Sequence, residues 1–272
     1  MREKKDTKKS RSLRTLVIYG AFVFVLILLS FTVRVFYLIE QSKFDGQHRF
    51  TLVIGQEKQV LGLISFEPVT SSLSLLIFPR NINLSFSSLN RKFGVIPDGY
   101  IKSRNNLSLK DTIPSMLQSF LFHPNEISTN INLYDLSRLY LYANKVPVGS
   151  VKVGDVSISS DDRDFNKDAS LLLTDNAIST ENVSVQIVNA AGQSGLGSRL
   201  ERVISNLGGN VVSVKTALVI EPVSKIRYYG TETYTLKKLE RLLRIKKEAV
   251  DKEDIAEIVI IIGEDNKDTS LF

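Results

Sequence analysis

The stretch VQIVNAAGQSGLGSRLERVISNLGG, residues 185–209, decides the fold of the C-terminal part of the chain. An apolar run leads into a loop that holds Gly192, Gly195 and Gly197. Apolar residues then recur at helical spacing until Gly208 and Gly209, and glycine is typical of a helix end in the left-handed conformation. The stretch therefore predicts a strand, a glycine loop and an amphipathic helix.

The glycine loop has two interpretations. A dinucleotide loop has the pattern G-x-G-x-x-G and an acidic residue after the second strand, whereas this loop reads G-x-x-G-x-G and no acidic residue follows at 213–217. We therefore expect Gly192 and Gly195 to adopt positive φ and Gly197 to let the helix pack close to the sheet. The alternative is a ligand site at Asn189, Gly192, Gly195 and Gly197, where free helix N–H groups hold an anionic or polar group.

The residues after this stretch continue the same pattern. Strands are expected at 210–214, 225–229 and 258–262, with a helix whose leucines lie at positions 236, 239, 242 and 243. Four cations of that helix are expected in water: Lys237, Lys238, Arg241 and Arg244. The order β-α-β-β-α-β predicts two helices on one face of a small sheet.

The N-terminus predicts a membrane anchor. Residues 1–14 carry seven basic and two acidic side chains, and TLVIYGAFVFVLILLSFTV, residues 15–33, carries no charge. Nineteen helical residues span roughly 28 Å, close to the hydrocarbon thickness of a bilayer. A cleaved signal peptide is the alternative, but it would have a shorter apolar region and a small-residue cleavage site, which is absent after Arg34.

Charge also bears on topology and on partners. The positive-inside rule places residues 1–14 in the cytoplasm and the chain after the anchor outside the cell membrane. The chain has 35 basic and 29 acidic residues, so 28 basic and 27 acidic residues remain beyond residue 14. This near-neutral body lacks the positive charge that nucleic-acid binding requires, and we expect no nucleic-acid partner. The chain has no cysteine, which excludes disulfides and thiolate metal sites.

The middle of the chain predicts a first α/β domain. Short apolar runs at 50–54, 60–66 and 73–78 are typical of adjacent strands, and a looser stretch follows at 81–106. Two amphipathic helices are expected, one beginning at Asp111 or Thr112 and one over 133–143 with Asn130 or Asn132 as its cap. Extended chain is expected again at 149–157, and the polar segment from 159 to 181 is expected to be a linker.

The fold class expected for the whole chain is α/β, with one N-terminal transmembrane helix and two small extracytoplasmic domains. The expected division is a cytoplasmic tail at 1–14, the transmembrane helix at 15–39, a first domain at 48–158, a linker at 159–181 and a second domain at 182–266.

Three segments of the second domain resemble one family. They are VSVQIVNAAGQSGLGSRLERVISNLGGNVVSV, KIRYYGTETYTLKKLERLL and EIVIIIGED, and in order and spacing they are similar to the C-terminal domain found on LytR-CpsA-Psr proteins. The resemblance covers about residues 182–266. The turn Asn189-Ala-Ala-Gly192 differs from the Asn-Gly turn of that pattern.

The first domain resembles, more faintly, the catalytic domain of the same family. VLGLISFEPVTSSLSLLIFPRNINL, residues 60–84, is similar to the paired strands that end in a Pro-Arg-Asp motif, with Asn81 in place of the Asp. The stretch 113–139 is similar to the helical region of that domain. The resemblance implies transfer of a glycopolymer from a polyprenyl-pyrophosphate lipid to the cell wall, with arginines on the pyrophosphate and acidic residues on a divalent metal.

Of that arginine and acidic set only Arg80 is matched, because the early Asp and the later pair of arginines are missing. We therefore expect a non-catalytic, membrane-anchored protein of a bacterial cell envelope, without cofactor or metal, that binds a cell-wall polymer or an envelope protein. The alternative is a divergent phosphotransferase in which Arg80 holds pyrophosphate and Asp161, Asp162 or Asp164 holds the metal.

Overall fold

The structure is a computed structural model that describes residues 3–56, 59–79, 84–107, 112–155, 173–251 and 255–267. The chain divides into two compact units. The first comprises residues 1–42 with 132–134, and the second comprises residues 43–131 with 135–272.

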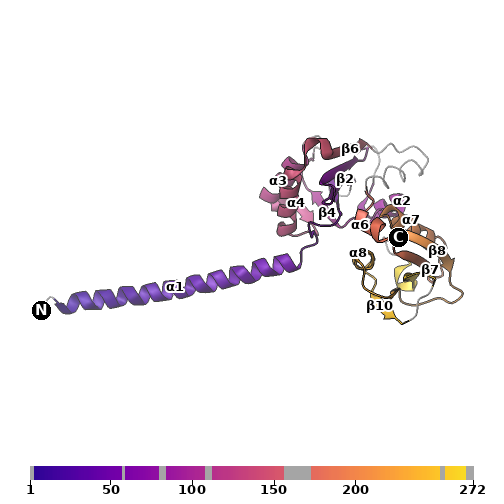
Figure 1. Cartoon of the computed structure of the whole chain (residues 1–272). Helices are drawn as coiled ribbons and strands as arrows, with labels where there is room; N and C mark the ends of the chain where they lie inside the picture. The colour runs from indigo at the N-terminus through magenta and orange to yellow at the C-terminus, as the bar shows by residue number, and fades with distance from the viewer. Residues whose placement is uncertain are drawn as a thin grey trace. The chain divides into compact units, whose positions relative to one another are not determined.

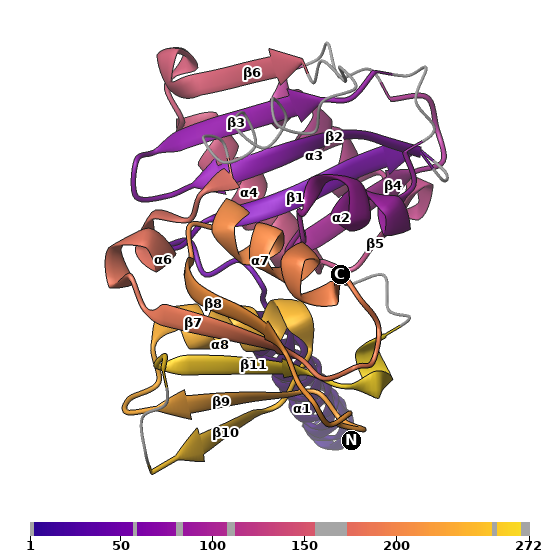
Figure 2. The same ribbon diagram turned by 90° about the vertical axis from the view of Figure 1, so that its right-hand side faces the viewer.

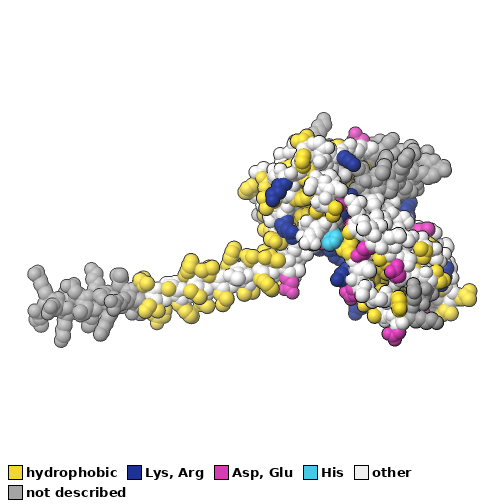
Figure 3. Space-filling model, viewed as in Figure 1, with side chains coloured by type: hydrophobic (Ala, Val, Ile, Leu, Met, Phe, Trp, Pro, Cys, Tyr) yellow, Lys and Arg dark blue, Asp and Glu magenta, His cyan; other side chains and the backbone are white. Residues whose placement is uncertain are grey.

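A continuous helix, α1 (Glu3–Glu40), makes up most of the first unit (Figure 1). Its segment Leu16–Glu40 contains 25 residues, is predominantly apolar with a mean hydropathy of 2.7, and is not buried. Figure 3 shows hydrophobic side chains along this part of the helix. By length and composition the segment can cross a membrane, as expected for 15–39. The helix itself extends beyond both ends of the expected span.

The first sheet of the second unit has six strands in the order β5-β4-β1-β2-β3-β6 (Figure 2). The three apolar runs form its centre as β1 (Phe50–Gln56), β2 (Gln59–Glu67) and β3 (Ser72–Ile77). These strands pair antiparallel in sequence order, with Phe50 opposite Phe66. The expectation of adjacent strands is confirmed.

Helices cover both faces of this sheet. On one face α3 (Ile113–Phe122) and α4 (Leu133–Lys145) enclose a core with Leu52, Ile64 and Phe66. On the other face α2 (Phe86–Phe93) packs on Val53 and Leu63. The side chain of Thr112 caps α3 through the Ser115 N–H, whereas Asp111 lies outside the described residues.

The expectation of a loose stretch at 81–106 was wrong in part, because this stretch contains α2 and β4 (Gly99–Ser103). The short strand β5 (Ile127–Thr129) was also missed. Both strands are stabilised by distant partners, since β4 pairs parallel with β1 and β5 pairs with β4. The extended chain expected at 149–157 begins with the 3₁₀ turn Val148–Ser150 and continues as β6 (Val151–Asp155).

The segment expected as a linker, 159–181, ends in a helix. Residues 156–172 lie outside the described ranges, and α6 (Asn176–Glu181) follows them. Leu173 and Ile178 are buried, so the end of this segment packs into the body of the unit. Asp175 caps α6 by accepting a hydrogen bond from the Ala177 N–H at 3.0 Å.

The second sheet has five strands in the order β10-β9-β11-β7-β8. Its elements are β7 (Ser184–Asn189), α7 (Leu196–Asn206), β8 (Asn210–Thr216), β9 (Lys225–Tyr229), α8 (Tyr234–Leu243), β10 (Lys247–Val250) and β11 (Ile258–Ile262). Apolar residues of α7 and α8 share one core with one face of the sheet, which confirms the expected arrangement.

Two details of the second sheet differ from expectation. The edge strand β10 was missed, because KEAV is short and half charged and pairs with β9 only at the sheet edge. Lys238 was expected in water, but it is 2% exposed and its Nζ lies 2.7 Å from Asp98 Oδ1. The leucine stripe of α8 faces the sheet core, whereas the Lys238 ammonium donates to the Arg49 carbonyl and to Asp98 of the same unit.

Candidate functional site

Asn189, at the end of β7, is buried and bonded within its own turn. Its Nδ2 donates to the Gln193 carbonyl at 2.8 Å, and its Oδ1 accepts from the Ala191 N–H at 3.3 Å. Only 4% of the residue is exposed. Its backbone carbonyl accepts the Ala217 N–H at 2.9 Å, which ties the turn to the end of β8. The polar groups of Asn189 thus shape the loop.

The three glycines of the loop have the backbone conformations and close packing expected of them. Gly192 and Gly195 have φ of 70° and 83°, the left-handed region that favours glycine. Gly197 has φ in the ordinary range, but a Cβ there would lie 2.9 Å from Val214 Cγ1. The interpretation of this loop as a strand-to-helix turn is confirmed in these geometric terms.

The loop between β8 and β9 packs against the glycine loop. The Glu221 N–H donates to the Ala190 carbonyl at 2.9 Å, and a Cβ on Gly192 would lie 3.0 Å from Ile220 Cδ1. Gly195 is the N-cap of α7, and no side chain caps it. A ligand role for Asn189, Gly192, Gly195 and Gly197 stays a prediction.

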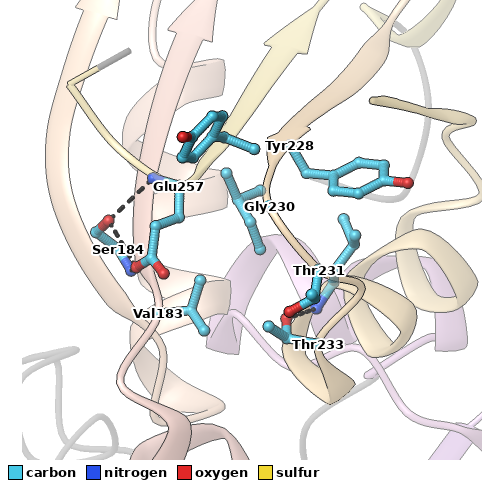
Figure 4. Close-up of a pocket in the computed structure, with 10 residues that line it drawn as sticks. Val183, Ser184, Tyr228, Gly230, Thr231, Thr233 and Glu257 are labelled. Atoms are coloured by element: carbon cyan, nitrogen blue, oxygen red, sulfur yellow. Dashed lines mark hydrogen bonds between the residues drawn. The ribbon is translucent and has the colours of Figure 1, made fainter. Parts of the chain in front are cut away.

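A pocket of about 440 Å³ lies at the opposite end of the second sheet. The start of β7, the start of β11, the end of β9 and the start of α8 form its walls. Its lining residues are Val183, Ser184, Tyr228, Tyr229, Gly230, Thr231, Thr233, Leu236, Glu257 and Ile258. In Figure 4, Ser184 and Glu257 lie on one side of this pocket, and Thr231 and Thr233 lie on the other.

Hydrogen bonds fix the Ser184 side of the pocket. Glu257 Oε2 accepts from the Ser184 N–H at 3.0 Å and from the Ser184 hydroxyl at 3.1 Å. The Glu257 N–H in turn donates to Ser184 Oγ at 3.0 Å (Figure 4). The carbonyl of Glu257 accepts the Tyr229 N–H at 2.9 Å. Three strands are therefore joined at this side of the pocket.

The other side of the pocket is the turn from β9 into α8. Gly230 has φ of 83°, which lets the chain reverse after Tyr229. Thr233 caps α8 by accepting the Leu236 N–H at 3.2 Å. The remaining first-turn donors of α8 point to Glu181, whose carboxylate accepts the Tyr234 N–H at 2.8 Å and the Thr235 N–H at 2.7 Å.

The charge at Glu181 is stabilised by these contacts. Desolvation raises the pKa of its carboxyl, but the hydrogen bonds from Thr235 and Tyr234 outweigh that effect, so the pKa is lowered below the ordinary value of 4.5. Next to the pocket, Lys247 lies 3.0 Å from both Glu232 and Glu240. The hydrogen bond to Lys247 lowers the pKa of Glu232, and the same bond raises the pKa of Lys247.

None of the four residues predicted as a ligand site lines this pocket. Ser184 and Asn189 stand at the two ends of β7, so the strand separates the two sites. The sequence did carry a signal for the pocket, because Tyr-Tyr-Gly-Thr at 228–231 places a glycine between a strand and a capped helix.

The residues of the alternative catalytic hypothesis lie outside the described residues. These are Arg80, Asp161, Asp162 and Asp164. Within the described ranges, no group of three His, Asp or Glu residues is placed to hold a metal ion.

The second domain matches a known family. The family model described as LytR cell envelope-related transcriptional attenuator matches residues 182–265, close to the expected limits of 182–266. The match covers β7 to β11 and the pocket, and the upstream resemblance to the LytR-CpsA-Psr catalytic domain remains a prediction.

Solved structures give weaker likenesses. The transcriptional regulator yvhJ from Bacillus subtilis is 9% identical, with a TM-score of 0.31, over 42% of this chain and 84% of that one. The Lin1025 protein from Listeria innocua is 10% identical, with a TM-score of 0.36, over 46% of this chain and 97% of that one. Among curated proteins, no sequence matches this chain.

Proposed function

We propose that the chain is a membrane-anchored cell-envelope protein whose extracytoplasmic unit binds a cell-wall polymer. One observation carries the proposal. An apolar helix of bilayer length ends at Glu40, and the unit that holds the family match at 182–265 begins at Lys43. Because the chain continues directly from the helix into this unit, the helix tethers the unit to the membrane of an envelope whose wall polymers are the proposed ligand.

The proposed topology follows from charge. The net positive residues at 1–14 precede the span, so the positive-inside rule keeps them in the cytoplasm and places residues 43–272 outside. The family description refers to the cell envelope, which agrees with this side of the membrane. The location also argues against direct control of DNA, because the folded unit is on the other side from the chromosome.

The proposed role is binding without turnover. Phosphotransfer from a lipid pyrophosphate needs several cations around two phosphates, because the developing charge is spread over many oxygens. Of the residues that the resemblance implies for this task the sequence keeps Arg80 alone, and Asn81 replaces the acidic neighbour. A domain that keeps a family fold and binds a related polymer requires fewer fixed charges.

The topology is tested by cysteine labelling, which is clean because the chain has no cysteine of its own. Ser12→Cys and Thr216→Cys are expressed separately in the full chain, and intact cells are treated with a membrane-impermeant maleimide. We expect labelling at position 216 in intact cells and labelling at position 12 only after permeabilisation. Labelling of position 12 alone in intact cells would overturn the proposed topology.

Binding is tested by co-sedimentation. The full chain in lipid nanodiscs is mixed with purified peptidoglycan sacculi, and nanodiscs that carry no protein serve as the control. The proposal predicts that the chain pellets with the sacculi. If the chain stays in the supernatant, the proposal of wall binding is overturned and an envelope protein is favoured as the partner.

A further inference from the structure

We infer that the pocket between Ser184 and Thr231 is the polymer site, and that it binds an uncharged stretch of glycan rather than a phosphate group. This inference rests on the proposed function, because it assigns the site and the ligand class for the same wall binding. The proposed site is not the glycine loop, which lies at the other end of β7.

The size of the pocket suits a short glycan segment. Its volume of about 440 Å³ falls within the range of roughly 300 to 1,000 Å³ that is typical of small-ligand sites. Its walls come from three strands and a helix start, and the hydrogen bonds between Ser184 and Glu257 hold two of these strands together. A polymer chain could therefore place one or two sugar rings in a largely preformed site.

The side chains at the pocket match the chemistry of sugars. The Thr231 hydroxyl can donate and accept hydrogen bonds, as the hydroxyls of a sugar do. The Ser184 hydroxyl already donates to Glu257, so toward a sugar it can act only as an acceptor. Tyr229 also lines the pocket and is 42% exposed. A tyrosine ring presents an apolar body and a polar tip, which suits a sugar ring with an apolar C–H face and a polar edge.

The charge of the pocket argues against a phosphate ligand. Its ten lining residues include no lysine or arginine, and Glu257 adds a carboxylate. Strong phosphate contacts are made by cations or by free backbone N–H groups, and a carboxylate repels an anion.

The start of α8, which borders the pocket, is already occupied. Its N–H groups at Tyr234 and Thr235 donate to the Glu181 carboxylate, and the N–H at Leu236 donates to Thr233. A helix start attracts anions through such free donors. Because the chain's own carboxylate takes this place, the pocket offers an external anion no helix start.

The experiment uses the full chain in nanodiscs and two preparations of sacculi. One preparation is untreated, and the other has been stripped of its phosphate-linked polymers by acid. We expect equal pelleting with both, because the ligand is the uncharged glycan. Loss of pelleting after stripping would overturn the assignment of ligand class.

Two variants test the site itself. Thr231→Ala and Tyr229→Ala remove exposed pocket groups. Each is expected to raise the concentration of sacculi at half-saturation about five- to tenfold. The matched control is Thr216→Ala, an exposed threonine at the opposite end of the sheet, which should bind as the wild type. Thermal melting confirms that each variant is folded.

The outcomes separate the two claims. If the wild type fails to pellet with untreated sacculi, the proposed function fails. If the wild type pellets and both pocket variants pellet equally well, the function stands and the pocket assignment is overturned.

Discussion

Glu257 and Ser184 form three reciprocal hydrogen bonds that join the start of β11 to the start of β7. The carboxylate accepts both the N–H and the hydroxyl of Ser184, and the Glu257 N–H returns to the same hydroxyl. The two strands are parallel neighbours, so the pair closes the end of the sheet at which the pocket lies.

Glu257→Ala is expected to lower the free energy of unfolding by about 1 kcal/mol, because two hydrogen bonds to a charged acceptor are lost at a solvent-accessible site. The matched control is Glu248→Ala, whose carboxylate contacts Arg227 at 2.8 Å with both side chains exposed. That surface pair should contribute little. Urea unfolding of both variants measures the difference, and equal losses would contradict the role given to Glu257.

Asn189→Ala is expected to lower the free energy of unfolding by about 1 to 2 kcal/mol, because the buried Ala191 N–H and the carbonyl of the exposed Gln193 lose their partner. Binding to sacculi should persist in the folded fraction. If Asn189→Ala kept its stability but lost binding, the result would instead favour the glycine loop as the ligand site.

Gly195→Ala and Gly208→Ala should differ in cost. Both positions have positive φ, which costs a residue with a Cβ about 1 to 2 kcal/mol. A Cβ at Gly195 meets nothing within 4 Å, whereas one at Gly208 would lie 2.8 Å from Thr174 Cγ2 and also collide with Ser179. Thermal unfolding should therefore rank Gly208→Ala as the less stable variant, and the reverse order would contradict the described turn.

Lys238→Ala is expected to lower the free energy of unfolding by about 3 kcal/mol or more, because it leaves the buried Asp98 carboxylate without its closest cation. Arg241, at 3.2 Å from the same oxygen, can compensate in part. The double variant Lys238→Met with Asp98→Asn removes both charges and should be more stable than Lys238→Ala. Urea unfolding that finds the double variant less stable would show that the pair acts by more than charge balance.

Acid should weaken the connection between α6 and α8. The folded-state pKa of Glu181 is lowered, so its contribution to stability is present above the unfolded value near 4.5 and is lost as pH falls through the folded value. Glu181→Gln should therefore destabilise the protein at pH 7, and the difference from the wild type should shrink as the pH falls below 4.5. An equal effect at both pH values, measured by urea unfolding, would contradict this account.

The second sheet was largely predictable from the sequence. The apolar run at 258–262 and the leucine spacing of α7 and α8 are local signals, and the structure places them as expected. The edge strand β10 carries no such signal, because half of its residues are charged. In the first sheet, β4 alternates buried and half-buried residues over only five positions. Its parallel partner, β1, lies far away in the sequence, so no local signal predicts the pairing.

The candidate site was harder to predict. Glycine spacing directed attention to the turn after β7, where Asn189 bonds within the turn and Gly192 and Gly195 adopt positive φ. The pocket is formed by residues from 183 to 258, and its contact between Ser184 and Glu257 joins positions 73 apart in the chain. The burial of Lys238 was missed for the same reason, since its partner Asp98 is 140 positions away.

The most direct test of the account asks which end of the second sheet meets the wall. Single cysteines at Thr231→Cys and Thr216→Cys are introduced into the otherwise cysteine-free chain, and the rate of maleimide labelling is measured with and without sacculi. The account predicts that sacculi slow labelling at position 231 and leave position 216 unchanged. Protection at position 216 with none at position 231 would contradict it.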